Sequence, residues 1–466
     1  MSDVLEQFIN PDNSVEEPTP PASSSPTFTG VPLFPLPSAQ SVDLAPNVKL
    51  QPPLSRRGHG PGLVIVIPSP IAPSDEGKDG GSAEQEEQEK MRKLLDPPPL
   101  QKWAEEGYAV LQLEVRGVGE EKEGDWGFEK VASEGVKRLL KTRECSSDRV
   151  GLIVYEPSLL DQVLLALLSF PNFRCLVTYS SSWEEPSVPT LQLLCTSDPK
   201  ASGTPAPPPS SSVDGTATPV VFPVTIVTYP VSTPYFFLPD HREAYNGPAA
   251  AAAHSKTLEF LKRAEHLDGP QFELEKLWEE HTYYEFTERS VEKKMATTVS
   301  DCYVNHVPTC AGGTGRDGLT IFYRDHFIFQ NPKETVFTRV SLTKGVDRVV
   351  EEFVCSMPHN QTIDWLLPGI PPTGKELHFT IVAIVAFRGD RICHEHIHWD
   401  QATVLSQLDL LPSHVPCGSP TELGTSSLVR LPVAGAETAK KALDQKAVES
   451  NEMLREGWKG VVDGVE

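Results

Sequence analysis

Apolar runs alternate with amphipathic segments through the first half of the chain. The runs stand at residues 63–67, 108–115, 149–155, 174–179, 191–195 and 222–229. Such uninterrupted apolar character is typical of strands that are buried on both faces of a parallel sheet. Helical patterns lie between or after them, at 128–143, 158–169 and 248–264. This alternation predicts an α/β domain with a parallel sheet over residues 61–266.

The pattern changes from residue 271, where helical periodicity comes first and strand patterns follow. Residues 273–306 predict one or two amphipathic helices that end near Asn305. Strand patterns follow at 320–329, 336–342, 347–357, 376–387 and 393–400. Helices followed by strands joined through turns predict an α+β domain with an antiparallel sheet over residues 271–415. A short helix is expected after Asp400, and residues 416–466 are expected to form a linker and a C-terminal helix.

The N-terminal segment has a different composition. Residues 1–60 are rich in Pro, Ser and acidic residues, and the chain holds 44 prolines in all. Such a segment buries too little apolar surface to offset the entropy of ordering, so it is predicted to be disordered. Residues 199–221 share this composition and are predicted to be an inserted loop.

Charge and targeting signals narrow the class of protein. The net charge of −23 argues against nucleic acid or an anionic membrane as a partner. None of the eight cysteines forms a C-x-x-C pair, and scattered cysteines fit a reducing compartment. The polar start has no apolar signal segment, and the run 163–170 is too short to span a membrane. We therefore expect a cytoplasmic protein whose partner is a small molecule.

One strand concentrates candidate chemistry. In CHEHIHWD (393–400), a period of two places His394, His396, His398 and Asp400 on one face. The other face then carries Cys393, Glu395, Ile397 and Trp399. A phase error of one residue would exchange the two sets and turn Glu395 inward. Three interpretations stay open: an acid/base pocket, solvated strand residues with Asp400 as a helix N-cap, and a metal site.

The helical segment offers a second group. His281, Glu285 and Glu288 stand on one helix face, which could look into a pocket or form a charged surface stripe. His306, His359 and His378 could contribute to a metal site with the strand histidines, but their arrangement cannot be read from the sequence. We expect no metal and no cofactor.

The second domain resembles the SnoaL-like polyketide cyclases of the nuclear-transport-factor-2-like fold. The resemblance rests on DCYVNHVPT (301–309), GLTIFYRDHF (318–327), residues 347–379 and FRGDRICHEHIHWDQATVLSQLDLL (387–411). It implies a cone-shaped α+β domain with a curved sheet around one pocket. It also implies His396 or His398 as the base, with Asp400 orienting the proton. The further residues expected to line the pocket are His281, Glu285, Tyr303, His306, Trp365 and His394.

The first domain resembles the dienelactone hydrolases of the α/β-hydrolase superfamily. The resemblance rests on residues 105–119, 148–155, 193–199 and 229–263. Glu156 stands where that family has its nucleophile, and Ser158 would be a shifted alternative. Pro157 follows Glu156 and lacks the N–H that an oxyanion hole requires.

The remaining triad positions are also degenerate. Asp198 matches the family acid, whereas the family histidine falls at Pro234 or Tyr235, and His241 comes six or seven places late. We expect this domain to be inactive in ester hydrolysis.

Together the two resemblances imply acid/base chemistry on a small carbonyl, lactone or polyketide-like compound. Two alternatives remain. One is a hydrolase that uses Ser158, Asp198 and His241 in an unusual layout. The other is a non-catalytic protein that binds a small molecule or forms a homodimer through the second domain.

Overall fold

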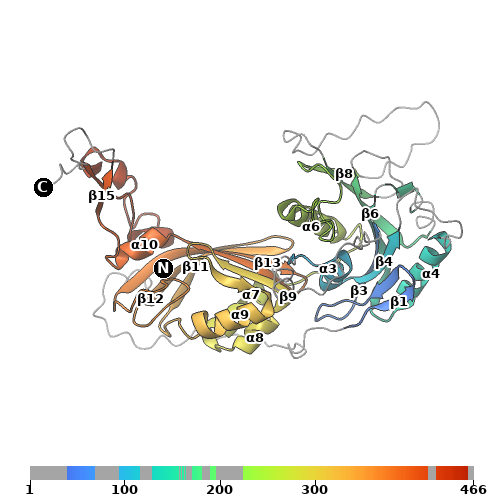
Figure 1. The fold of residues 1–466 in the computed structure, drawn as a ribbon, viewed down its shortest axis with the longest axis horizontal. Coiled ribbons are helices and arrows are strands. Elements are labelled where there is room, and N and C mark those ends of the chain that lie inside the picture. Colours follow the sequence, from blue (N-terminus) through green and yellow to red (C-terminus); the bar gives the residue numbers. More distant parts are fainter. Residues whose placement is uncertain are drawn as a thin grey trace, which may run out of the picture. The chain divides into compact units, whose positions relative to one another are not determined.

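The computed structural model describes residues 39–68, 94–115, 128–156, 158, 160–161, 163, 170–180, 189–195, 224–417 and 427–459. These residues fall into two compact units (Figure 1). The first comprises the described residues up to Leu274 together with Phe387–Arg391, and the second comprises Glu275–Ala386 and the described residues from Ile392 onward.

The first unit is built on an eight-stranded sheet with the order β1-β2-β4-β3-β5-β6-β7-β8. The strands are β1 (Val42–Ala45), β2 (Val48–Gln51), β3 (Gly60–Pro68), β4 (Ala109–Val115), β5 (Cys145–Val154), β6 (Phe173–Ser180), β7 (Thr190–Cys195) and β8 (Val224–Tyr229). The strands from β4 to β8 in this order pair in parallel, whereas β1 and β2 are antiparallel additions at one edge. The described helices are α3 (Pro99–Glu105), α4 (Phe128–Lys141) and α6 (Gly247–Leu261).

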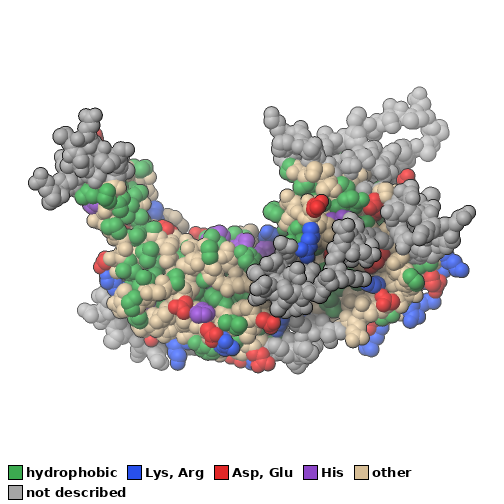
Figure 2. Space-filling model, in the orientation of Figure 1, with side chains coloured by type: hydrophobic (Ala, Val, Ile, Leu, Met, Phe, Trp, Pro, Cys, Tyr) green, Lys and Arg blue, Asp and Glu red, His purple; other side chains and the backbone are tan. Residues whose placement is uncertain are grey.

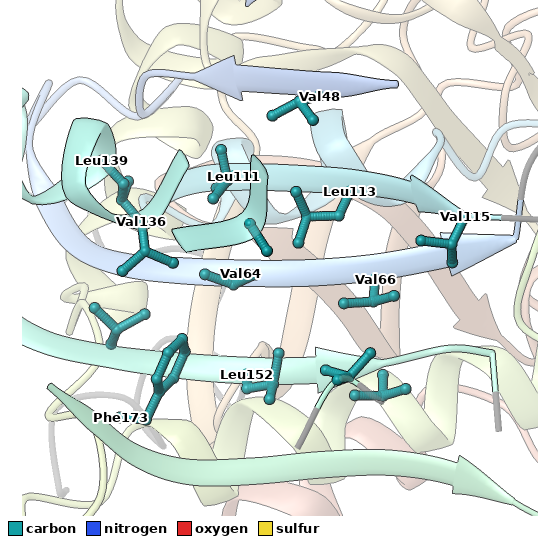
Figure 3. Close-up of a cluster of buried hydrophobic side chains, with 14 of the residues drawn as sticks. Val48, Val64, Val66, Leu111, Leu113, Val115, Val136, Leu139, Leu152 and Phe173 are labelled. Carbon is teal, nitrogen blue, oxygen red and sulfur yellow. The ribbon is translucent and has the colours of Figure 1, made fainter. Parts of the chain in front are cut away.

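Apolar side chains cover both faces of this sheet, which explains the continuous apolar runs. Val64 and Val66 of β3 pack with Leu111 of β4 and with Val136 and Leu139 of α4 in one core (Figure 3). Leu63 and Ile65 point to the opposite face and are also fully buried. The mixed sheet with helices is compatible with the predicted α/β class.

One prediction for this unit is wrong, and others fall outside the described residues. Residues 42–51 were expected to be disordered, but they form β1 and β2, and Val48 and Leu50 are buried because apolar residues alternate there. The loop 199–221 and most of the helix expected at 158–169 lie outside the described residues.

The second unit wraps helices around a six-stranded sheet with the order β10-β9-β14-β13-β12-β11. The strands are β9 (Thr298–His306), β10 (Ala311–Thr314), β11 (Val336–Lys344), β12 (Arg348–Pro358), β13 (Glu376–Arg388) and β14 (Arg391–Trp399). The helices are α7 (Leu274–Thr282), the π-helical turn η2 (Tyr283–Thr287), α8 (Val291–Ala296), α9 (Gly315–Phe322), the π-helical turn η3 (Tyr323–Phe327) and α10 (Gln401–Gln407). The pair β9–β14 is parallel, so the sheet is mixed rather than wholly antiparallel.

Two secondary-structure predictions for this unit are wrong. Residues 298–306 were assigned to a helix but form β9, where Cys302, Val304 and His306 alternate as buried positions with a period of two. Residues 320–329 were assigned to a strand, but residues 320–327 belong to α9 and η3 and a turn follows. Their aromatic content favours strands, yet Leu319, Phe322 and Tyr323 have helical spacing and are buried on one side.

The C-terminal segment forms a small hairpin and short helices. The hairpin pairs β15 (His414–Cys417) with β16 (Ser427–Arg430), and α11 (Glu437–Leu443), η4 (Glu452–Leu454) and η5 (Glu456–Lys459) follow. The single C-terminal helix predicted within 416–466 is therefore replaced by several short helices. None of the helices in the described ranges is both long and apolar enough to cross a membrane.

Candidate active site

A cavity of about 260 Å³ opens between the helices and one face of the second sheet. Most of its lining side chains are apolar or aromatic: Trp278, Phe286, Tyr323, Phe327, Phe337, Phe353, Trp365, Ile381, Ala383 and Ile397. The polar members are Thr282, Glu285, His306, Arg339, Glu351 and Glu395. An apolar cavity with a few convergent polar groups is the usual form of a small-molecule site.

Strand β14 turns Glu395 and Ile397 toward this cavity. In the parallel pairing with β9, Glu395 lies opposite Val304 and Ile397 lies opposite His306. All four side chains are buried, so they form the inner face of the two strands. The strand therefore offers a carboxylate to the cavity, not a row of imidazoles.

The phase assigned to this strand from the sequence is corrected by the structure. His394, His396 and His398 lie on the opposite face, where His394 is paired with Tyr303 in the β9 register. His398 is exposed, and the His396 ring lies 5.5 Å from the Tyr303 ring. Histidine side chains are visible on the molecular surface in Figure 2. These three histidines and Tyr303 are absent from the cavity lining, and the catalytic role assigned to His396 and His398 stays a prediction.

Asp400 is the N-cap of α10. Its carboxylate accepts hydrogen bonds from the Ala402 backbone N–H at 3.0 Å and from the Thr403 hydroxyl at 2.7 Å. This satisfies donors of the first helical turn. The structure thus gives Asp400 a capping contact and an exposed position away from the cavity.

Four charged side chains meet at the inner end of the cavity. His281 Nε2 lies 3.1 Å from Glu395 Oε1 and 3.4 Å from Glu285 Oε1. Lys294 Nζ lies 3.3 Å from Glu285 Oε1 and 3.5 Å from Glu395 Oε1. All four side chains are at most 4% exposed. We call this group the buried charge cluster; it pairs two acids with two bases, as burial of charge requires.

The hydrogen bonds of His281 indicate which of its ring nitrogens carry a proton. The Thr297 hydroxyl donates to the Lys294 carbonyl at 2.7 Å, so its oxygen accepts from His281 Nδ1 at 2.5 Å. Nδ1 therefore carries a proton. Because Nε2 faces two carboxylates, a proton on Nε2 as well makes the ring an imidazolium and the buried charge cluster neutral.

Electrostatics agree with this assignment. Burial and the Lys294 ammonium act to lower the pKa of His281, but the carboxylates of Glu395 and Glu285 raise it above its ordinary value. Burial alone would raise the pKa of Glu395. The Lys294 ammonium and then His281 hold that pKa well below its usual range.

Two π-helical turns and one capped helix carry several side chains of the cavity and of the buried charge cluster. Glu285 and Phe286 lie in η2, and Tyr323 and Phe327 lie in η3. Single π-helical turns inside α-helices recur at functional sites because they shift the register of the side chains that follow. The hydroxyl of Ser290 caps α8, whose inner side carries Lys294.

The three acidic and imidazole groups could in principle hold a metal ion. Ligand atoms of His281, Glu285 and Glu395 lie within 4.8 Å of one another. However, the Lys294 ammonium contacts the same oxygens of both carboxylates. It also lies 3.0 Å from the centroid of the Tyr323 ring. The chain therefore supplies its own cation at this position, and we assign no metal ligands.

His306 and Tyr323 flank the buried charge cluster with neutral groups. His306 Nδ1 donates to the Ala311 carbonyl at 3.2 Å, which leaves Nε2 as an acceptor. Burial lowers the pKa of His306 to about 4, so the ring is neutral near pH 7. Burial, followed by Glu395, raises the pKa of Tyr323 well above its ordinary value. The Tyr323 hydroxyl thus stays protonated, 3.5 Å from Glu395 Oε1.

A second polar group lies elsewhere in the cavity. Glu351 accepts a hydrogen bond from Trp278 Nε1 on Oε2 and one from Arg339 Nε on Oε1, both at 2.5 Å. Arg339 also contacts Glu275 at 3.0 Å and Glu279 at 3.6 Å. The side chain of Arg339 is 41% exposed. This group therefore marks the rim of the cavity.

The residues of the first unit that were predicted to form a degenerate hydrolase site have a different arrangement. Glu156, buried after β5, accepts hydrogen bonds on Oε1 from the Ser158 hydroxyl at 2.6 Å and the Ser158 backbone N–H at 3.1 Å. The Tyr235 hydroxyl donates to Oε2 at 2.8 Å. His241 stacks on the Tyr235 ring with centroids 4.8 Å apart. Asp198 lies outside the described residues.

Comparison with known proteins identifies one segment of the chain. Residues 280–408 match the SnoaL-like polyketide cyclase family. This confirms the resemblance of the second domain, and the matched segment holds every residue that lines the cavity except Trp278. The resemblance of the first domain to dienelactone hydrolases stays a prediction. No curated protein matches the chain.

Solved structures that are similar to part of the chain share little sequence with it. An NTF2-like protein of unknown function from Burkholderia pseudomallei is 17% identical, with a TM-score of 0.24, over 30% of this chain and 98% of its own. IdmH from Streptomyces antibioticus, a candidate polyketide cyclase, is 21% identical over 30% and 99%, with a TM-score of 0.24. TsrD from Streptomyces laurentii is 17% identical over 30% and 96%, with a TM-score of 0.25.

Sequence reasoning missed several residues of this site. Lys294 carried no signal, because it stands beside Lys293 in an ordinary helical pattern and only the fold buries it. Tyr323 was placed in a strand. Arg339 and Glu351 each stand in a strand with several other polar residues, so the sequence does not distinguish them from their neighbours. Glu395 was considered only as the outcome of a phase error.

Proposed function

We propose that the SnoaL-like domain is an acid/base enzyme that acts on a small carbonyl compound, in a reaction of the cyclase or isomerase type. One observation carries the proposal. Glu395 lines the cavity as a buried carboxylate and contacts His281, Lys294 and Tyr323 through Oε1. This leaves Oε2 as the oxygen able to take a proton from a bound compound.

The proposed step is proton abstraction next to a carbonyl. The C–H bond breaks, its proton moves to Glu395 Oε2, and its electron pair moves onto the carbonyl oxygen as an enolate. The buried charge cluster loses one negative charge at Glu395 as the ligand gains one. The two cations, His281 and Lys294, then stabilise the enolate electrostatically. The Tyr323 O–H, which lies 3.5 Å from Glu395 Oε1 in the free protein, then turns to the enolate oxygen and donates to it.

The low pKa of Glu395 sets the character of this base. Lys294 and His281 keep it ionised at neutral pH, so it is always ready to accept a proton. The same two cations make Glu395 a weak base. Its basicity rises once part of their attraction acts on the enolate that develops on the ligand. Catalysis thus depends on His281 and Lys294 stabilising the Glu395 carboxylate before the proton transfer and the enolate after it.

Isotope exchange tests this proposal before the natural substrate is known. The full chain and a Glu395→Gln variant are incubated in deuterium oxide with a panel of ketones, lactones and β-dicarbonyl compounds, and deuterium uptake is followed by mass spectrometry. General-base catalysis typically contributes a factor of about 100 or more. We expect that loss in the variant. Equal exchange in both proteins would reject Glu395 as the base, and binding without exchange in either would favour a binding protein.

The first unit is proposed to be inactive in ester hydrolysis. The Ser158 hydroxyl already donates its hydrogen bond to the Glu156 carboxylate, and the His241 ring stacks on the Tyr235 ring. Aryl ester turnover that disappears in Ser158→Ala would contradict this. A homodimer formed through the SnoaL-like domain stays a prediction.

A further inference from the structure

Glu351 is the second carboxylate on the inner face of the sheet. It lies opposite Ala383 in the β12–β13 pairing, and both side chains line the cavity. Glu395 lies on β14, so β13 separates the two carboxylates. Neighbouring strands are about 5 Å apart, so the backbones that carry these two groups lie roughly 10 Å apart across the sheet. A flat compound of two fused rings, with a polar group at each end, spans such a distance.

Glu351 has acceptor capacity left. An ionised carboxylate can accept about four hydrogen bonds. Glu351 receives one from Trp278 and one from Arg339, on different oxygens. These two donors fix the orientation of the carboxylate. A third donor from a bound molecule would meet an oriented acceptor.

The surrounding charges disfavour an anionic group at this position. Arg339 has one glutamate against each of its three nitrogens, through Glu351, Glu275 and Glu279. Lys344 also pairs with Glu275, at 3.2 Å. Three acids therefore face two bases at the rim. Each nitrogen of the guanidinium already faces a carboxylate, so a carboxylate or phosphate on a ligand would be repelled by the three acids.

We infer that Glu351 is a specificity-determining residue that accepts a hydrogen bond from a hydroxyl group on a neutral, flat, fused-ring compound whose reacting end lies at Glu395. The inference rests on the proposed function only in the placement of that reacting end. The aromatic wall fits the ring system: the Phe286 and Phe337 rings are 4.6 Å apart, and the Phe337 and Phe353 rings are 5.3 Å apart.

Binding of simple probes tests this inference without any turnover. Naphthalene, naphthol, dihydroxynaphthalene and naphthoate are titrated into the full chain by calorimetry or by tryptophan fluorescence. A hydrogen bond to a charged acceptor corresponds to about ten-fold or more in affinity. We expect dihydroxynaphthalene to bind at least that much more tightly than naphthalene, and naphthoate to bind most weakly.

Paired variants assign the effect to one residue. Glu351→Gln is compared with Glu352→Gln, because Glu352 is the next residue on the same strand and contacts Ser341 instead of the cavity. We expect the preference for dihydroxynaphthalene over naphthalene to fall about ten-fold in Glu351→Gln and to persist in Glu352→Gln. The parent protein supplies an independent test if Glu351→Gln fails to fold, since its own ranking of the probes must hold.

Three results would overturn the inference: equal binding of naphthalene and its diol by the parent protein, a preference that survives in Glu351→Gln, or no binding of any probe. These results are distinct from failure of the proposed function. Hydroxyl-dependent binding with no deuterium exchange would leave Glu351 in its role and reject Glu395 as a base.

Discussion

Removing Lys294 is the perturbation that tests the buried charge cluster most severely. Lys294→Met replaces the ammonium with an apolar group of similar length and leaves Glu285 and Glu395 facing one imidazolium. Lys294 is 0% exposed, so water cannot replace the lost cation. Breaking a buried ion pair by removing one partner typically costs about 3–5 kcal/mol. We expect a loss of this size in the free energy of unfolding of the SnoaL-like domain.

The adjacent lysine provides a matched control. Lys293 is 47% exposed and pairs with Glu288 at the surface. Lys293→Met makes the same substitution in the same helix. We expect only a small change in the free energy of unfolding, because exposed ion pairs contribute little. The pair of variants therefore separates buried charge from helix propensity and from net charge.

Urea denaturation gives the readout, with hydrogen exchange of the β9–β14 peptides assigning the transition to this domain. Adding Glu395→Gln to Lys294→Met removes one charge of each sign, so it should restore about 1–3 kcal/mol through the coupling between the two residues. The reasoning is refuted if Lys294→Met unfolds at the same urea concentration as Lys293→Met. It is also refuted if the second substitution lowers stability further instead of restoring it.

Other substitutions yield more limited predictions. The folded-state pKa of His306, about 4 against an ordinary 6.5, means that the unfolded chain binds the extra proton first. Stability is then complete above about pH 6.5 and falls by about 3 kcal/mol toward pH 4, and His306→Gln should flatten this dependence in urea titrations at each pH. Asp400→Ala should cost about 1 kcal/mol in thermal or urea unfolding through the lost N-cap, while deuterium exchange at saturating ligand stays unchanged. A loss of exchange in Asp400→Ala without a loss of stability would return Asp400 to the active site.

Much of the fold could be predicted because buried strands and helices have apolar residues at regular spacings in the sequence. The two-sided apolar strands of the first unit and the strand patterns at 336–342, 347–357 and 376–387 correspond to described strands. The prediction failed where local propensity and fold disagree. Tyr323 and Phe327 are good strand formers by residue type, but the packing of α9 places them in a helical turn.

The site was harder to predict because polar residues occupied both faces of β14. Because of its three histidines, the candidate pocket was assigned from the sequence to the histidine face of this strand. Ile397 and Trp399 share the face of Glu395, and two apolar companions were a signal that this face is buried. Lys294 had no such signal, because the sequence around it does not distinguish it from Lys293. Its burial arises only when α8 packs against η2, α9 and β9, which brings the Lys294 side chain to Glu395.

The central claim is that the chemistry lies on the inner face of β14, and one comparison tests it directly. Deuterium exchange into a responsive carbonyl compound is measured for the parent protein, for Glu395→Gln and for the double variant His396→Ala/His398→Ala. The account predicts that exchange falls by a factor of about 100 or more in Glu395→Gln and stays at the parent rate in the double variant. The opposite pattern, with exchange lost in the double variant and kept in Glu395→Gln, would place the chemistry on the histidine face and contradict the account.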